Sequence, residues 1–117
     1  MLILPLKKEW YEKIKSGEKT IEYREVKPYW TVRIGNSMHE LATFNFYEPT
    51  ELYEKISALG YSQEFEEDFD LLLQMRYVTK RRINATISKI EVIDGIDTDL
   101  HIDKPVYAIH LSNIKEA

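Results

Sequence analysis

Two long strand patterns near the end of the chain place the strongest constraint on its fold. In residues 83–93, apolar side chains alternate at positions 83, 85 and 87 and then slip to 90 and 92, which predicts a strand with a bulge near Ser88 and Lys89. Residues 106–114 form the last predicted strand. Helical patterns do not alternate regularly with the strand patterns, so a parallel α/β fold is disfavoured. We therefore predict an α+β protein built on a small, mostly antiparallel β-barrel with helices packed at its openings.

The first third of the chain supplies a strand, a helix and a second strand. Residues 2–6 are apolar and bounded by lysines, which predicts a short buried strand. Residues 7–16 predict an amphipathic helix with Trp10 and Ile14 on its apolar stripe, and Gly17 marks its end. Residues 18–24 alternate in the manner of a half-exposed strand.

The middle of the chain predicts a strand followed by helices. Residues 28–30 predict a turn or short helix, and residues 38–47 predict a strand. A short helix is expected over 50–58, and a second from Ser62 to about Arg76, with its apolar stripe at Phe65, Phe69, Leu72 and Leu73. Residues 94–103 predict an acidic, solvated loop.

Composition narrows the class of protein. A chain of 117 residues, 44% hydrophobic and 31% charged, is expected to form one globular domain over 1–117. The sequence contains no cysteine, which excludes disulfides and thiolate metal sites and fits the reducing interior of a cell, so we predict a cytoplasmic protein. No apolar run approaches the roughly 18–20 residues of a membrane span. The three histidines lack metal-ligand spacing, so neither metal nor cofactor is predicted.

Charge is distributed unevenly along the chain. Residues 1–35 carry eight Lys or Arg and five Glu, whereas residues 36–117 carry eight Lys or Arg and fifteen Asp or Glu. A basic first third on an acidic protein indicates either a local anion-binding surface or the ordinary unevenness of small proteins.

The segment from Gly17 to Arg24 contains an ammonium, a carboxylate and a guanidinium close together, and a strand needs none of these groups for its core. Lys19 can bind phosphate, or act as a base if burial lowers its pKa; the alternative is a solvated lysine on an exposed strand face. Glu22 and Arg24 are two residues apart and share a face of a regular strand. They either form a structural ion pair at the barrel mouth or together bind a base edge and a phosphate. Lys19 and Glu22 are also a candidate general acid/base pair.

Aromatic and basic residues near this segment extend the candidate site. Tyr29 and Trp30 can stack a nucleobase or cap the barrel core, with the core role favoured for Trp30. A second basic group near residues 76–82 either contacts phosphate or offsets the acids at 64–70. Further phosphate contacts are expected from four basic residues if they lie on the same face, and otherwise these are plain surface charges: Lys7, Lys8, Lys27 and Arg33.

The first thirty residues resemble a known family. The runs Leu4-Pro5-Leu6-Lys7-Lys8-Glu9-Trp10, Ile14 to Arg24, and Lys27-Pro28-Tyr29-Trp30 are similar to the ASCH domain, a member of the PUA-like superfamily. The family motif Gly-x-Lys-x-x-Glu-x-Arg is matched at its four positions by Gly17, Lys19, Glu22 and Arg24. The resemblance is strong over residues 2–30 and only general over 38–47 and 82–114. Relative to compact members of the family, residues 50–80 look like a helical insertion.

The resemblance implies a fold and a class of ligand. It implies a PUA-like β-barrel of five or six strands with flanking helices, and RNA or a nucleotide-like ligand in a cleft along the motif strand. Some members are hydrolases: one group deacylates N4-acetylcytidine, and another comprises ribonucleases. In the first group the motif lysine works with a threonine nucleophile at the position that Glu22 holds here, and a glutamate cannot serve as an alkoxide.

Three functions follow as hypotheses. The leading one is a domain that binds RNA or a nucleotide-like small molecule, in which Lys19 and Arg24 engage phosphate or an acceptor edge and Glu22 accepts from an exocyclic amine. The second is a small hydrolase of modified nucleosides or RNA, with Lys19 as base and Glu22 as its acid partner. The third is a regulatory module that contacts another protein through residues 50–80.

Overall fold

The computed structural model describes residues 2–41, 54, 56–65, 70–75 and 81–116. These residues form two helices, one short 3-10 helix (η1) and six strands. In chain order they are β1 (Leu2–Leu6), α1 (Lys8–Lys15), β2 (Ile21–Glu25), α2 (Pro28–Leu41), β3 (Ser62–Glu64), β4 (Asp70–Met75), β5 (Arg82–Asp94), η1 (Gly95–Asp97) and β6 (Pro105–Glu116).

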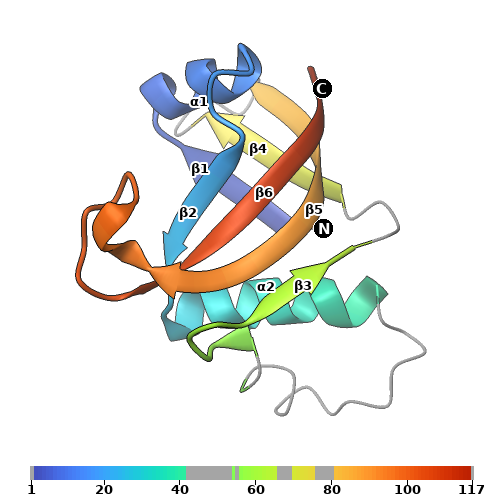
Figure 1. Ribbon diagram of the computed structural model, residues 1–117. Helices are drawn as coiled ribbons and strands as arrows, with labels where there is room; N and C mark the ends of the chain where they lie inside the picture. The colour runs from blue at the N-terminus through green and yellow to red at the C-terminus, as the bar shows by residue number, and fades with distance from the viewer. Residues whose placement is uncertain (1, 42–53, 55, 66–69, 76–80, 117) are drawn as a thin grey trace.

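The strands form one curled sheet. Its order is β1-β4-β5-β6-β2, and β3 pairs with β5 beside this path. The β1–β4 pair is parallel, and the other pairings are antiparallel. Figure 1 shows the sheet wrapping into a half-barrel, with α1 at one end and α2 at the other. The prediction of an α+β, mostly antiparallel, barrel-like fold with helices at its openings is confirmed.

Two irregularities in the pairing of β5 with β6, one extra residue in each strand, allow the sheet to curl. The pairing of β5 with β6 shifts register between Asn84 and Thr86 and again between Ile87 and Lys89. An extra residue in one strand bends that strand and increases its local twist. The second shift confirms the bulge predicted near Ser88 and Lys89. β5 pairs with β6 along one edge, and with β4 and then β3 along the other.

The core lies on the concave side of the sheet. The alternation read from the sequence of β5 is confirmed, because Ile83, Ala85, Ile87, Ile90 and Val92 are all buried. The other members of the core come from neighbouring strands and both helices: Leu2, Leu4, Leu6, Tyr11, Ile14, Ile34, Ile56, Leu73, Tyr107, Ile109 and Leu111. Each fully buried Leu or Ile side chain contributes roughly 1.5–3 kcal/mol. No helix within the described ranges is long and apolar enough to cross a membrane.

The second helix confirms one prediction in part and overturns another. Residues 28–30 are the first turn of α2, which continues to Leu41, so the strand predicted over 38–47 is wrong for residues 38–41. Residues 42–47 lie outside the described residues. Proline lacks an N–H and has a fixed φ, which breaks a helix interior but suits its first position. Pro28 therefore begins the helix, and the amide of Thr31 already donates to the carbonyl of Lys27 at 2.9 Å.

The helix predicted from Ser62 to about Arg76 is also wrong where the structure describes it. Residues 62–64 form β3, and residues 70–75 form β4 between β1 and β5. The run Leu71-Leu72-Leu73 in β4 fits a short strand as well as one side of a helix, because periodicity alone does not distinguish the two in a short apolar run. Of the helix predicted over 50–58, residues 54 and 56 are helical, and residues 50–53 and 55 lie outside the described ranges.

The loop between β5 and β6 is folded tightly on itself. The Asp94 side chain accepts from the amide of Ile96 at 3.1 Å, and the Thr98 hydroxyl donates to the Gly95 carbonyl at 2.8 Å. Gly95 is packed so closely that an added Cβ would lie 2.7 Å from Cγ1 of Val106 and 2.9 Å from the carbonyl oxygens of Ile102 and Lys104. The loop predicted to be merely solvated is thus held in one shape.

We expect Gly95→Ala to lower the free energy of unfolding by about 2 kcal/mol, because a methyl group there overpacks backbone that cannot move away. Urea denaturation measures the change. Asp97→Ala, in the same short helix but exposed, is the control and should change stability by less than about 0.5 kcal/mol. Equal effects of the two substitutions would contradict the tight packing.

Candidate functional site

A cleft of about 550 Å³ opens where the curled sheet fails to close. The strands β1 and β2 are the two ends of the strand order, and residues of both line the cleft, so it follows the seam of the half-barrel. The lining residues come from β1, α1, β2, α2 and the β5–β6 loop: Pro5, Leu6, Lys7, Glu9, Trp10, Lys19, Glu22, Tyr23, Arg24, Trp30, Asp99 and Leu100.

The backbone of Tyr23 faces this seam. The amide of Leu111 donates to the Thr20 carbonyl at 2.8 Å, and the amide of Val26 donates to the Pro105 carbonyl at 3.1 Å. Hydrogen-bonding direction alternates along an antiparallel ladder, so even-numbered residues of β2 bond to β6 and the N–H and C=O of Tyr23 point away from it. An edge strand with free groups of this kind is open to pairing with another chain.

Two side chains of the motif form hydrogen bonds with the free amide and carbonyl groups of Tyr23. Oε1 of Glu22 accepts from the amide of Tyr23 at 3.0 Å, and Nη1 of Arg24 donates to the carbonyl of Tyr23 at 2.9 Å. The same Nη1 also donates to Oε1 of Glu22 at 2.8 Å. Glu22 and Arg24 therefore share a strand face, as predicted, and form an ion pair that covers the edge of β2.

Arg24 also ties β2 to β1. Its Nη2 donates to the carbonyl of Pro5 at 2.7 Å, and its guanidinium carbon lies 5.2 Å from the centre of the Trp30 ring. The side chain is 16% exposed. One guanidinium thus bridges the two end strands where backbone pairing is missing, and the ion pair at the barrel mouth has a structural role.

Glu22 retains one oxygen without a partner. The residue is 4% exposed, and among the described residues no hydrogen bond reaches its Oε2, although that atom is buried. A buried acceptor left unsatisfied costs about 1–3 kcal/mol, and more when it is charged. Glu22 is also one of the residues that line the cleft.

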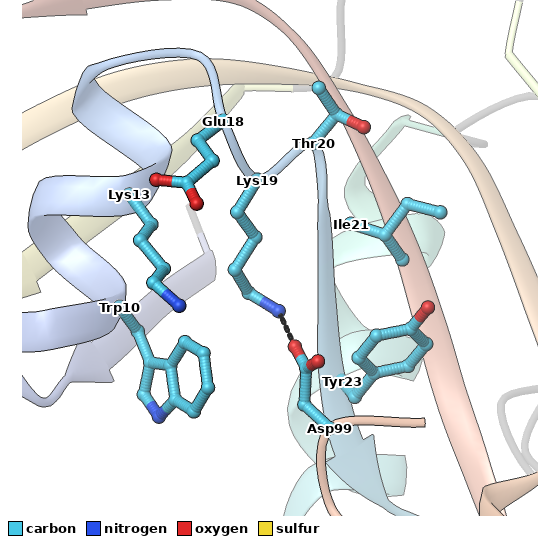
Figure 2. Close-up of a pocket in the computed structure, with 8 residues that line it drawn as sticks. All are labelled: Trp10, Lys13, Glu18, Lys19, Thr20, Ile21, Tyr23 and Asp99. Atoms are coloured by element: carbon cyan, nitrogen blue, oxygen red, sulfur yellow. Dashed lines mark hydrogen bonds and ion pairs between the residues drawn. The ribbon is translucent and has the colours of Figure 1, made fainter. Parts of the chain in front are cut away.

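Lys19 lies in the loop before β2 and its side chain is only 9% exposed. Figure 2 shows it extending toward Asp99, with Trp10 on one side and Tyr23 on the other. Its Nζ donates to Oδ2 of Asp99 and lies 5.1 Å from the centre of the Trp10 ring and 5.0 Å from that of Tyr23. The alternative of a solvated lysine on a strand face is wrong. Lys19 pairs with Asp99, while Glu22 pairs with Arg24.

The remaining predicted residues are only partly brought together. Lys7 and Trp30 line the cleft. Tyr29 is 51% exposed; its ring meets Trp30 edge-on at 4.8 Å and is covered by the guanidinium of Arg33 at 3.6 Å. Lys8 and Lys27 are exposed and do not line the cleft. Of the second basic group, Arg81 and Arg82 are exposed, and residues 76–80 lie outside the described residues.

Three residues important to the site were not predicted. The sequence pattern places Trp10 on the apolar stripe of the first helix, Tyr23 among the apolar residues of the half-exposed strand over 18–24, and Asp99 in a solvated loop. Burial raises the pKa of Tyr23, and the carboxylates of Asp99, Glu91 and Glu22 raise it further. The position of Asp99 depends on the pairing of β6 with β2, a long-range contact that no local pattern reveals.

A smaller hollow of about 280 Å³ lies beside the cleft (Figure 2). Trp10, Lys19, Tyr23 and Asp99 line both spaces. Lys13, Glu18 and Thr20 are found only in the smaller one, where Nζ of Lys13 lies 5.1 Å from the Trp10 ring centre. The Lys19–Asp99 pair therefore stands between the two spaces.

No family model matches the chain, and neither a curated protein nor a solved structure matches it significantly.

We expect Arg24→Ala to lower the free energy of unfolding by about 3 kcal/mol, because it opens the seam and leaves the Glu22 carboxylate buried without its cation. Urea denaturation measures the loss. The exposed Arg82→Ala is the matched control and should cost less than about 0.5 kcal/mol. Adding Glu22→Ala should recover part of the loss, since the unpaired charge is then removed. Strictly additive losses would argue against the pair.

A second polar group, on β5 and β6, gives stability a dependence on pH. Glu91 lies within 3.0 Å of Nζ of Lys89 and 3.4 Å of Nε2 of His110. The hydrogen bond from Lys89 lowers the pKa of Glu91; burial opposes this, and His110 adds to the lowering.

A lowered pKa in the folded state means that Glu91 stabilises the fold above its ordinary value of 4.5 and that this contribution is lost as pH falls through the folded value. We expect Glu91→Gln to cost about 0.5 kcal/mol at pH 7, with the difference from wild type shrinking as pH falls through the lowered pKa of Glu91 in the folded state. Urea denaturation at a series of pH values tests this. Glu64→Gln, exposed on β3, should show no such pH-dependent difference.

Proposed function

We propose that this protein is an ASCH-type, PUA-like domain that binds RNA or a nucleotide-like ligand, with a nucleobase held in the cleft between β1 and β2. The observation that carries the proposal is Oε2 of Glu22, a buried acceptor without a partner in the described part of the chain, on a residue that lines the cleft.

The size and walls of the cleft support a flat aromatic ligand. Its volume of about 550 Å³ falls within the roughly 300–1,000 Å³ of small-molecule sites. Trp10 and Trp30 contribute indole rings to its lining. Aromatic rings of this kind stack on bases of any sequence, which is how proteins hold bases that have left a helix.

The polar group at the inner side of the cleft suits the edge of a base. A carboxylate accepts and does not donate, so Glu22 complements an exocyclic amine or a ring N–H. The hydrogen bonds from Tyr23 and Arg24 to Oε1 fix the orientation of the carboxylate before any ligand arrives. A ligand that binds here meets a prepared acceptor and not a mobile side chain.

Groups at the rim suit the sugar–phosphate part of a ligand. Lys7 is exposed and lines the cleft. Tyr29 and Arg33 lie on the exposed side of α2, next to Trp30. They can contact a phosphate or a further base that continues out of the cleft.

The mostly antiparallel half-barrel and the four matched motif positions support the family assignment within this proposal. The hydrolase alternative has less support, because the two groups assigned to it are engaged elsewhere. The charge of Lys19 is neutralised by Asp99, and Glu22 forms an ion pair with Arg24 at the seam between β1 and β2. The regulatory alternative depends on residues 50–80, of which 50–53, 55, 66–69 and 76–80 lie outside the described ranges.

Binding of the four ribonucleosides and of short single-stranded RNA, measured by calorimetry, tests the proposal. We expect Glu22→Gln to weaken binding at least ten-fold, since the loss of a charge-assisted hydrogen bond costs about 1.5–3 kcal/mol. The matched control is Glu12→Gln, at an exposed residue of α1 that does not line the cleft.

Three outcomes decide the result. Binding that falls in the Glu22 variant and not in the control supports the proposal. Equal affinity of wild type and Glu22→Gln, or no binding of any of these ligands, contradicts it. Turnover of a nucleoside such as N4-acetylcytidine, followed by mass spectrometry of the same mixtures, would favour the hydrolase instead.

A further inference from the structure

The charges that line the cleft cancel. Its cationic side chains are Lys7, Lys19 and Arg24, and its anionic ones are Glu9, Glu22 and Asp99. The two buried cations are each paired: Arg24 with Glu22, and Lys19 with Asp99. In the smaller hollow, Lys13 and Lys19 face Glu18 and Asp99. A site built to attract phosphate would instead present an excess of positive charge.

Asp99 is placed over Lys19 by the fold of its loop. Besides the bonds of Asp94 and Thr98 to η1, the amide of Leu100 donates to the Thr98 hydroxyl at 3.3 Å. The amide of His101 donates to the Thr98 carbonyl at 3.0 Å, and that of Gly95 donates to the Lys104 carbonyl at 2.8 Å. These bonds on both sides of Asp99 fix the backbone that carries it, so the carboxylate is a built part of the cleft.

Lys19 is confined as well. Its side chain is 9% exposed, and its ammonium lies between the rings of Trp10 and Tyr23. Buried in this way, it cannot swing out to meet a phosphate in solvent. An anion must come to Lys19, and there it meets the carboxylate of Asp99, which is 40% exposed. Two anions on one ammonium repel each other, and in a partly buried place this repulsion is screened less than in water.

We propose that Asp99 sets the ligand specificity of the cleft. By neutralising Lys19, it makes the cleft select the uncharged heterocycle of a ligand and reject a phosphate at this position. Removal of the carboxylate charge turns Lys19 into an anion site. The identity of the heterocycle as a nucleobase rests on the proposed function, whereas the rejection of phosphate by Asp99 rests only on the contacts of Lys19.

The test compares the four ribonucleosides with their 5′-monophosphates, and includes inorganic phosphate as a probe that does not depend on the base. Affinities are measured by calorimetry at low and at moderate salt for wild type, Asp99→Asn and Asp97→Asn. The last variant is the matched control: it makes the same change in net charge on the same loop, at an exposed residue that does not line the cleft.

We expect wild type to bind a nucleoside as tightly as its monophosphate, or more tightly. In Asp99→Asn the monophosphate should bind about ten-fold tighter than in wild type, with a gain that shrinks as salt rises. Its nucleoside affinity should change less than three-fold, and Asp97→Asn should behave as wild type. A second variant, Lys19→Met with Asp99→Asn, should lose the gain, which would assign it to the ammonium.

The outcomes separate this proposal from the function it builds on. A ten-fold preference of wild type for the monophosphate, or the same phosphate affinity in Asp99→Asn and Asp97→Asn, would overturn the role of Asp99. If no nucleoside or monophosphate binds to any variant, the proposed function fails. The role of Asp99 is then decided by the binding of inorganic phosphate alone. Its binding to Asp99→Asn, and not to wild type or the control, supports the role of Asp99; its failure to bind overturns it.

Discussion

The guanidinium of Arg24 is the contact on which the rest of this structure depends. The strand order ends at β1 on one side and β2 on the other, and in the described residues no backbone ladder joins these two ends. Arg24 spans the gap with donors to Pro5, Tyr23 and Glu22. A side chain that replaces a strand pairing leaves room beside it, and that room is the cleft. The motif therefore both closes the half-barrel and opens a site in it.

The same arrangement explains why charged residues occur in a strand that borders the core. Glu22 is opposite Ile109 and Arg24 is opposite Tyr107 in the β2–β6 register, so these charges face an apolar neighbourhood. A buried ion pair is seldom a source of net stability, because desolvation cancels much of the attraction. Here the pair satisfies the backbone of Tyr23 and shields an edge strand, a task that apolar side chains cannot perform.

Strong local periodicity decides which parts of the fold the sequence predicts. The predictions for β1, α1, β2, β5 and β6 hold because alternation and helical stripes are clear there. The predictions fail for residues 38–41, which continue α2, and for β3 and β4, because the leucine run in β4 fits a strand as well as a helix. In the site, Lys19, Glu22 and Arg24 follow from their spacing. Asp99 does not, since only tertiary pairing brings it to Lys19.

The separation of Lys19 and Asp99 by 80 residues has a consequence for how the site comes into being. The cleft needs β1 beside β4 and β2 beside β6, pairings that join the beginning of the chain to its middle and its end. Contacts this distant in sequence tend to form late and slowly, because the entropy lost in closing a long loop precedes the stabilisation that the contact provides. We therefore expect the cleft to be among the last features to form, and a partly folded chain to carry the motif without the cleft.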